Sequence, residues 1–343
     1  MLASAAFTGR WLRFLRNVGP VTFSLAKFIK RSRVPQGVGG APDASSGAED
    51  YSESIREIFD VQRPLVFMHI PKTAGSTLMS ELRRALRPKI SVNGYDRYLF
   101  GTFSQFSTID AAIRQNIYLS SDAMPRDADF VAGHIALSTL VSVFNTGQLL
   151  TLLREPFCRL LSLWLYWRQY DDQLLAAWGE WMDRVRLAHQ DFSTFLDARI
   201  IAPQIDNIFV RMLLWPHVLI PEDDFIDPAD DPQLVAEATN KLSQFAFLDV
   251  VENSALFDRL GAWLGRPVAN TRINDTETMP VPLRRPLHRQ LTQSVYEQLE
   301  SRSRLDIQLW KHVARQSMPN ADINKLLERT RLDHVARYAG MMA

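Results

Sequence analysis

Residues 69–78, HIPKTAGSTL, follow the apolar run LVFM and bring a lysine, a glycine and three hydroxyl side chains to the start of the helical segment SELRRALR. Between a strand and a helix, several backbone N–H groups point at one place, where the helix dipole is positive. An anion site is therefore predicted, with Lys72 adding a full charge. Its further donors are the hydroxyls of Thr73, Ser76 and Thr77. The alternative is an ordinary turn with Ser76 as the helix N-cap.

The residue order of this turn differs from that of a nucleoside-triphosphatase P-loop, G-x-x-x-x-G-K-[ST]. Gly75 has no partner glycine four to five residues earlier, and no Gly-Lys-Ser/Thr follows it. Thr73 follows Lys72 directly, but outside the context in which such a hydroxyl binds Mg²⁺. The turn is therefore predicted to bind a phosphate-like anion without the metal geometry of phosphoryl transfer.

A second group of anion-binding side chains lies in TLLREPFCRLLS, residues 151–162. Arg154 ends a predicted strand, where its planar guanidinium can bind a phosphate through two N–H groups. Glu155 and Pro156 mark the start of a helix, and Ser162 lies about two turns into it, within reach of the same anion. The alternatives are a salt-bridged helix start and a serine that the helix tolerates.

Together, the two segments resemble the donor-binding motifs of sulfotransferases that use 3′-phosphoadenosine 5′-phosphosulfate (PAPS). The order Pro-Lys-Thr-x-Gly-Ser/Thr-Thr-Leu is similar to the 5′-phosphosulfate loop of the carbohydrate sulfotransferases of the heparan 2-O/6-O type and their bacterial relatives. The Arg154 segment is similar to the 3′-phosphate element of that family. This chain has Ala74-Gly75 where the family usually has Gly-Gly, and Glu155 where it has Asp.

The resemblance covers about residues 62–316. PQIDNIFVRMLL is similar to a family helix that places Asn207 and Arg211 on one face, and RIN at 272–274 is similar to the family's terminal Asn segment. The family implies in-line transfer of a sulfuryl group from PAPS to an acceptor oxygen or nitrogen, with no metal. Lys72 would stabilise the leaving phosphate. The residues implied to bind the donor are Lys72, Thr73, Ala74, Gly75, Ser76, Thr77, Arg154 and Ser162.

An alcohol acceptor must lose a proton, a task for a group that titrates near neutrality. His134, in FVAGHIALS, comes just past a predicted strand, at the sheet edge where open α/β folds bind ligands. It resembles the catalytic base of the family's 2-O enzymes; a structural histidine is the alternative. His69 is expected to support the turn. The other histidines are expected at the surface: His189, His217, His288, His312 and His334.

Short apolar runs that lead into helical segments predict an α/β protein with a three-layer, P-loop-like fold: a central parallel sheet flanked by helices, with a helical C-terminal part. The strands are expected within 63–70, 129–134, 148–154 and 245–252. The helices are expected from Pro156 and at 192–199, 204–214, 233–244, 253–264 and 284–316, with a last helix at 320–339 capped by Asn320.

Composition favours a large intracellular domain. A chain of 343 residues with 46% hydrophobic content can bury a substantial core. The one cysteine, Cys158, allows no intrachain disulfide and favours a reducing, cytoplasmic compartment. A net charge of +1 gives no indication of a nucleic-acid partner, and no segment approaches the roughly 20 apolar residues of a membrane span.

The N-terminal segment has a different composition from the rest. Residues 1–42 contain no acidic residue, and the basic amphipathic pattern at 10–33 predicts peripheral contact with the inner face of a membrane. A disordered leader and a transit segment are the alternatives. The chain is thus divided into a leader and linker (1–50), a sulfotransferase domain (51–318) and a C-terminal helical tail (319–343). The sequence does not indicate an oligomeric state.

The acceptor is the least determined part of the prediction. The resemblance implies a glycan or glycolipid, while a lipid or small molecule stays open. The aromatic stretch at 164–181, WLYWRQYDDQLLAAWGEW, is predicted to line the acceptor side, with core packing as the alternative. Two other classes of function also stay open: a P-loop-like nucleotide kinase, and a non-catalytic anion-binding protein at a membrane.

Overall fold

The computed structural model describes residues 62–270, 279–340 and 342. Two groups of sequence predictions lie outside these residues: those on the leader and linker at 1–50 and that on the RIN segment at 272–274.

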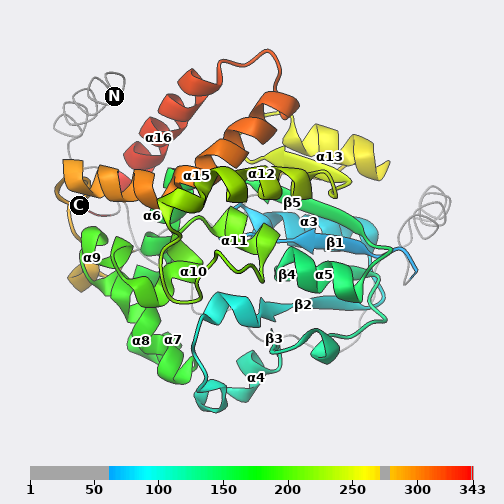
Figure 1. Ribbon diagram of the computed structural model, residues 1–343, viewed down its shortest axis with the longest axis horizontal. Coiled ribbons are helices and arrows are strands. Elements are labelled where there is room, and N and C mark those ends of the chain that lie inside the picture. The colour runs from blue at the N-terminus through cyan, green and yellow to red at the C-terminus, as the bar shows by residue number, and fades with distance from the viewer. Residues whose placement is uncertain (1–61, 271–278, 341, 343) are drawn as a thin grey trace, which may run out of the picture.

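Six parallel strands form the central sheet, in the order β3-β2-β4-β1-β5-β6 (Figure 1). The strands are β1 (Leu65–Met68), β2 (Ser91–Asp96), β3 (Ile117–Tyr118), β4 (Phe130–His134), β5 (Gln148–Leu153) and β6 (Phe247–Val250). Each of the four apolar runs contains one of these strands, so those four predictions are confirmed. β2 and β3 were not predicted, because Asn93 and Gly94 interrupt the first and the second has two residues.

Helices cover both faces of the sheet, as the α/β prediction required. On one face α3 (Gly75–Leu86) and α13 (Leu256–Leu264) pack against Leu65 and Phe67 of β1. Val66 and Met68 point to the opposite face, because successive side chains of a strand alternate. That face is covered by α5 (Leu137–Val143), α6 (Pro156–Arg168), α11 (Ile208–Leu214) and α15 (Gln293–Ser317).

The strand order brings three loops to one edge of the sheet. β1 lies between β4 and β5, and all three run parallel, so their carboxyl ends are adjacent. The chain leaves β1 for α3 on one face and leaves β4 for α5 on the other, which opens a crevice at this edge. The turn after β1, His134 at the end of β4 and Arg154 after β5 therefore meet there.

The helix after β5 begins where the sequence predicted. Pro156 is the first residue of α6, and the Glu155 carboxylate accepts a hydrogen bond of 2.8 Å from the backbone N–H of Cys158. Every residue of α6 except Tyr166 is buried, because helices surround it on all sides. The side chains of this helix therefore either pack in the core or line the adjacent cavity.

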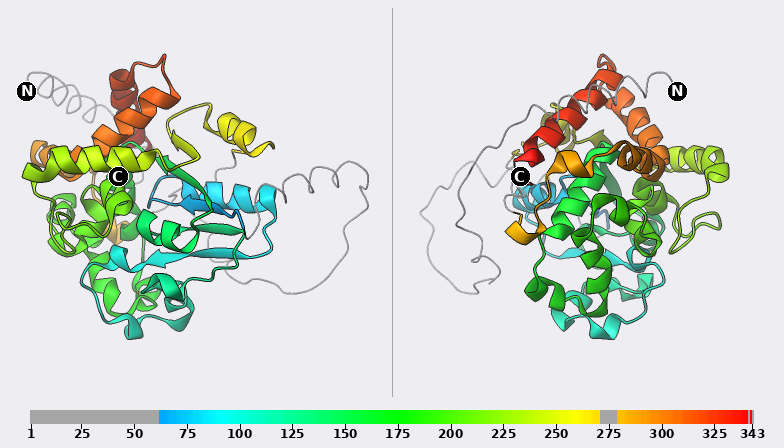
Figure 2. Two further views of the ribbon diagram at one scale, coloured as in Figure 1. Left: turned by 45° about the vertical axis from the view of Figure 1, so that its right-hand side comes forward. Right: turned by 90° about the vertical axis from the view of Figure 1, so that its left-hand side faces the viewer.

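The helical C-terminal part is also present, with different boundaries. The helix predicted at 284–316 consists of the short α14 (Leu287–Gln290) and the long α15. The last helix is α16 (Ile323–Ala339), and its N-cap is Asp322 rather than the predicted Asn320. Figure 2 shows α15 and α16 as an inverted V at one end of the molecule. The remaining α-helices are α4 (Ala111–Arg114), α7 (Asp172–Ala176), α8 (Met182–Arg186), α9 (Phe192–Leu196), α10 (Ala202–Ile205) and α12 (Asp231–Leu242).

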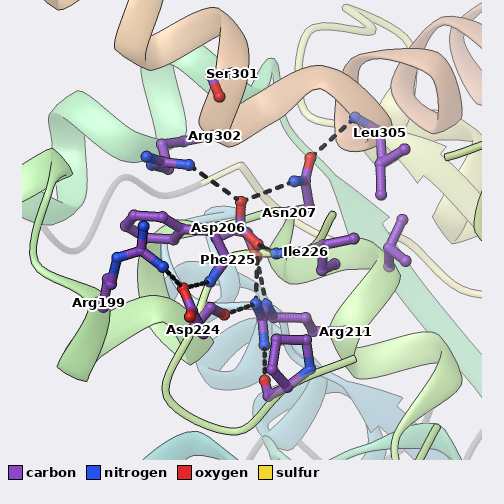
Figure 3. A network of polar contacts seen from close by, with 12 residues as sticks. Arg199, Asp206, Asn207, Arg211, Asp224, Phe225, Ile226, Ser301, Arg302 and Leu305 are labelled. Carbon is purple, nitrogen blue, oxygen red and sulfur yellow. Dashed lines mark hydrogen bonds and ion pairs between the residues drawn. The ribbon is translucent and has the colours of Figure 1, made fainter. Parts of the chain in front are cut away.

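The helix predicted at 204–214 is interrupted between α10 and α11, where Asn207 adopts a left-handed conformation (φ 45°). A buried polar network holds this junction (Figure 3). The Asp206 carboxylate accepts hydrogen bonds from Arg211 Nη2 at 2.9 Å and from the backbone N–H of Ile226 at 3.0 Å. Asn207 Oδ1 accepts a hydrogen bond of 2.9 Å from the backbone N–H of Leu305, which ties the junction to α15. Asn207 and Arg211, which the resemblance placed on one helix face, therefore serve this network.

We expect Asp206→Ala to lower the free energy of unfolding by about 3–5 kcal/mol, because it removes the carboxylate paired with a buried guanidinium. Urea denaturation followed by circular dichroism measures this change. The matched control is Asp224→Ala, which removes the exposed partner of Arg199 and should change the free energy by less than about 1 kcal/mol. Equal, small effects of the two substitutions would contradict the assignment.

Candidate functional site

A cavity of about 410 Å³ lies at the carboxyl edge of β4, β1 and β5. It brings together all but one of the predicted site residues: Lys72, Ala74, Gly75, Ser76, Thr77, His134, Arg154 and Ser162 line it. Thr73 is the exception. Its side chain is fully buried, and its hydroxyl donates a hydrogen bond of 2.8 Å to the carbonyl oxygen of Ile70. This hydroxyl closes the turn instead of facing the cavity.

The turn after β1 has a strained backbone. Lys72 (φ 69°) and Ala74 (φ 61°) both occupy the left-handed region, which costs a residue with a side chain about 1–2 kcal/mol. Any side chain at position 75 would displace the buried His69 ring, because a Cβ there would lie 1.9 Å from Nε2 of His69. Arg154 Nη1 donates a hydrogen bond of 2.9 Å to the Lys72 carbonyl oxygen, which holds the turn in this conformation. Strain of this kind concentrates at functional sites.

The amino end of α3 faces the cavity. Its N-cap residue is Ala74, whose side chain makes no capping hydrogen bond, so the alternative of an ordinary turn with Ser76 as the N-cap is wrong. Gly75, Ser76 and Thr77 form the first turn of this 12-residue helix and line the cavity. The positive end of the helix dipole therefore lies at the cavity wall, where it favours a bound anion.

Positive charge accumulates around the turn. The Nζ atom of Lys72 lies 3.7 Å from the centre of the Tyr166 ring. Burial, with further contributions from Arg154 and Arg159, lowers the pKa of Lys72 to about 7. Arg159 is buried, and its Nη1 has no hydrogen-bond partner among the described residues. The described residues that line the cavity include no Asp or Glu. An anion is the ligand that would compensate this charge.

The acidic residue of the second motif has a structural role. The Glu155 carboxylate is fully buried and lies 2.7 Å from Nη2 of Arg331 in α16. The sequence left a salt-bridged helix start as one alternative for this motif. That alternative is correct for Glu155. Its partner, however, is Arg331, so Arg154 keeps its guanidinium at the cavity.

The last helix contributes to the site, which the sequence did not predict. Arg154 Nη2 lies 3.3 Å from Nδ1 of His334. Because a guanidinium can only donate, this Nδ1 accepts and the imidazole is neutral. Burial, then the charges of Arg154 and Arg337, lower the pKa of His334 well below its usual value. His334 is only 7% exposed, so its predicted place at the surface is wrong. Arg337 and Tyr338 line the cavity beside it.

His134 has the protonation state of a general base. Its Nδ1 lies 2.6 Å from the carbonyl oxygen of His69. A carbonyl can only accept, so Nδ1 carries the proton and Nε2 has a lone pair available. Burial lowers the pKa of His134 to about 4, so the ring is neutral at pH 7. The His69 ring lies 4.4 Å from that of His134 and packs against Gly75, in the supporting position expected for it.

Aromatic side chains form the rest of the cavity wall. The stretch predicted to line the acceptor side supplies Tyr166, Trp167, Tyr170, Trp178 and Trp181. Trp164 of the same stretch packs in the core instead, with its ring stacked 4.8 Å from that of Phe192. Some residues of this stretch therefore line the cavity, and others pack in the core.

Within the described ranges, no group of three or more His, Cys, Asp or Glu side chains is placed to hold a metal ion. No helix among those residues has the length and apolar character needed to cross a membrane. Neither a scan against protein-family models nor a search of curated proteins gives a match to this chain. What the cavity binds must therefore be inferred from the residues that line it.

We expect sulfate binding to weaken as pH rises through about 7, because a bound dianion favours the protonated form of Lys72. Above that pH, Lys72 takes up one proton for each sulfate that binds. The value of log Kd should therefore rise by about one unit per pH unit. Titration calorimetry from about pH 6 to about pH 9 measures this slope, over a range in which a normal lysine stays charged. Sulfate itself keeps its charge throughout.

Lys72→Met is the matched variant, because it should bind sulfate weakly and without this slope. Asp306, whose pKa is raised to about 7 by burial, is retained in it, so any remaining slope belongs to other groups. An unchanged slope in Lys72→Met would exclude Lys72 as the titrating group.

Without an anion, the Lys72 pKa lies below that of an unfolded lysine, about 10.4. The contribution of Lys72 to the free energy of unfolding should therefore rise with pH between those two values.

Proposed function

We propose that the protein is a PAPS-dependent sulfotransferase with a P-loop-like donor site. The observation that carries this proposal is the convergence of two anion-binding segments in one cavity. The strained turn after β1 and Arg154 after β5 lie on the same edge of the sheet, near the buried guanidinium of Arg159. Two groups of anion donors from different segments of the chain suit a nucleotide that carries two anionic groups, a phosphate at the 3′ position and a phosphosulfate at the 5′ position.

The turn is the proposed site of the 5′-phosphosulfate. The amino end of α3 would bind its oxygens through backbone N–H groups, and Lys72 would stabilise the charge that develops on the leaving phosphate. Arg154 and Ser162, on neighbouring elements, would bind the 3′-phosphate. Arg337 of α16 also lines the cavity and adds positive charge at this end.

His134 is the proposed general base. Its Nε2 would accept the proton of the acceptor hydroxyl while the acceptor oxygen attacks sulfur. The bond from sulfur to the 5′-phosphate breaks on the opposite side, and 3′-phosphoadenosine 5′-phosphate (PAP) leaves. The hydrogen bond from Nδ1 to the His69 carbonyl oxygen would fix the tautomer and the orientation of the ring for this step.

A nucleotide kinase has less support. Such enzymes hold Mg²⁺ near the phosphates with a carboxylate and a P-loop hydroxyl, and the described cavity lining offers no carboxylate. The Thr73 hydroxyl, which follows the lysine in sequence, is engaged with the backbone of the turn. PAP is therefore expected to bind more tightly than ATP with Mg²⁺.

The donor site should depend on both anion-binding segments. Arg154→Ala is expected to weaken PAP binding by about 1.5–3 kcal/mol, the contribution of a charge-assisted contact, and Lys72→Ala is expected to abolish transfer. Titration calorimetry measures the first effect, and transfer of radiolabelled sulfate from PAPS measures the second.

Arg84→Ala is the matched control, because Arg84 lies on the solvent side of α3 and does not line the cavity. It should bind PAP as the unmodified protein does. Unchanged PAP affinity in Arg154→Ala would overturn the assignment of the second segment. Tighter binding of ATP with Mg²⁺ than of PAP would favour a kinase.

The base and the lysine together predict a bell-shaped pH profile. kcat/KM should rise as His134 loses its proton at about pH 4 and fall as free Lys72 loses its proton above about pH 7. His134→Ala should keep PAP affinity and lose about 10²–10⁴-fold in turnover. His312→Ala, on α15 outside the cavity, is the control. Near-normal turnover in His134→Ala would assign proton removal to another group.

A further inference from the structure

We infer, on the basis of the proposed function, that the acceptor is a small, uncharged phenol rather than a glycan. The Lys72 and Arg154 motifs that suggested a glycan belong to the donor site, and His134 is the one residue of the acceptor side that shares the resemblance to glycan enzymes. That side is divided into a polar end near His134 and Lys72 and an apolar aromatic body beyond it. A molecule with one hydroxyl on a flat apolar ring matches this division.

The apolar body of the cavity is built mainly from buried side chains. Leu99, Phe100, Leu163, Trp167, Trp181 and Val185 line it, and each is at most 8% exposed. The half-buried Trp178 completes this wall, with its ring edge-on to that of Tyr95 at 5.7 Å. Aromatic faces and edges at such distances accept another planar ring in stacked or edge-to-face geometry.

The polar atoms of this side gather at one end. The Tyr95 ring lies 5.6 Å from that of His134, and the Tyr166 ring lies under Nζ of Lys72. The Tyr170 ring lies 5.2 Å from that of Tyr166. Burial raises the pKa of Tyr170, and the charge of Tyr166, a hydrogen bond with Tyr166 and the charge of Tyr95 raise it further. We place the acceptor hydroxyl at this end of the cavity, beside His134 and Lys72.

The remaining wall offers little hydrogen bonding for a sugar. Among the described lining residues, the side-chain amides are Gln204 and Asn270, and Nε2 of Gln204 already donates to the Leu99 carbonyl oxygen at 2.8 Å. A sugar carries several hydroxyls, and each one buried without a partner is unfavourable. A phenol carries one, which the polar end can satisfy.

Charge also argues against an anionic glycan. The charged side chains that line the cavity, among the described residues, are Lys72, Arg154 and Arg337. All three belong to the donor side of the proposed site, so none remains for the carboxylates of an anionic glycan. The described part of the lining has no Asp or Glu to pair with an amine acceptor either. An uncharged acceptor is therefore favoured.

The reaction with a phenol balances with the groups present. The phenol oxygen forms the new bond to sulfur, its proton passes to Nε2 of His134, and the sulfur–phosphate oxygen bond breaks with its electron pair leaving on PAP. A phenol hydroxyl, with a pKa of about 10, is far more acidic than an aliphatic one. His134, a weak base because of its burial, is better matched to such an acceptor.

The test compares four acceptors with the full chain and PAPS: β-naphthol, octanol, an uncharged disaccharide, and heparosan as an anionic glycan. We expect kcat/KM to be highest for β-naphthol by about tenfold or more, the factor that ring stacking of about 1.4 kcal/mol supplies. A higher kcat/KM for any of the other three would overturn the inference.

A pair of tryptophan variants tests the wall itself. Trp178→Ala should raise the KM for β-naphthol by about tenfold and leave the Kd of PAP unchanged. Trp263→Ala, which removes a half-buried tryptophan outside the cavity, should change neither. An unchanged KM in Trp178→Ala would overturn the placement of the acceptor.

PAP binding separates this inference from the proposed function. If PAP raises the melting temperature of the protein but β-naphthol is not sulfated, the phenol inference is wrong and the donor site still stands. If PAP does not bind, the proposed function itself is wrong.

Discussion

The Arg154 guanidinium joins the three parts on which the site depends. It extends from the end of β5, donates to the carbonyl oxygen of Lys72 in the turn after β1, and donates to His334 in the last helix. The first contact stabilises a turn in which two residues with side chains have positive φ. The second fixes α16 against the cavity. The parallel strand order places β5 beside β1. The Arg154 side chain then links the turn to the last helix, because it contacts both.

Burial lowers the pKa of both candidate catalytic groups, and each effect has a different place in the proposed reaction. It keeps His134 neutral, with its tautomer fixed by the His69 carbonyl oxygen, so a lone pair is available without prior loss of a proton. It also lowers the pKa of Lys72, since neighbouring arginines add to the loss of hydration. A bound anion reverses that effect and restores the charge of the lysine. A bound anion, such as the proposed donor, would thus make the site fully charged.

The sequence predicted the four mainly apolar strands and brought out the residues that belong to motifs, and it missed what depends on contacts between distant segments. β2 was missed because Asn93 and Gly94 weaken its strand pattern. The break at Asn207 depends on a hydrogen bond to α15, about a hundred residues later, which no local pattern reports. The role of His334 was missed for the same reason, because its partner Arg154 is 180 residues earlier in the chain. A polar helix without a motif gives no indication of such a contact.

The aromatic stretch at 164–181 explains why the acceptor was the weakest part of the sequence prediction. In a helix buried on every side, apolar periodicity does not separate residues that fill the core from residues that line a cavity. Trp164 and Trp167 are both buried, yet one stacks on Phe192 and the other lines the cavity. The donor motifs lie on strand ends and helix starts, where spacing determines geometry. The proposed acceptor wall comes from segments that have no fixed distance from one another in the sequence. Its chemistry, apolar rings around one polar end, is therefore seen only in the folded structure.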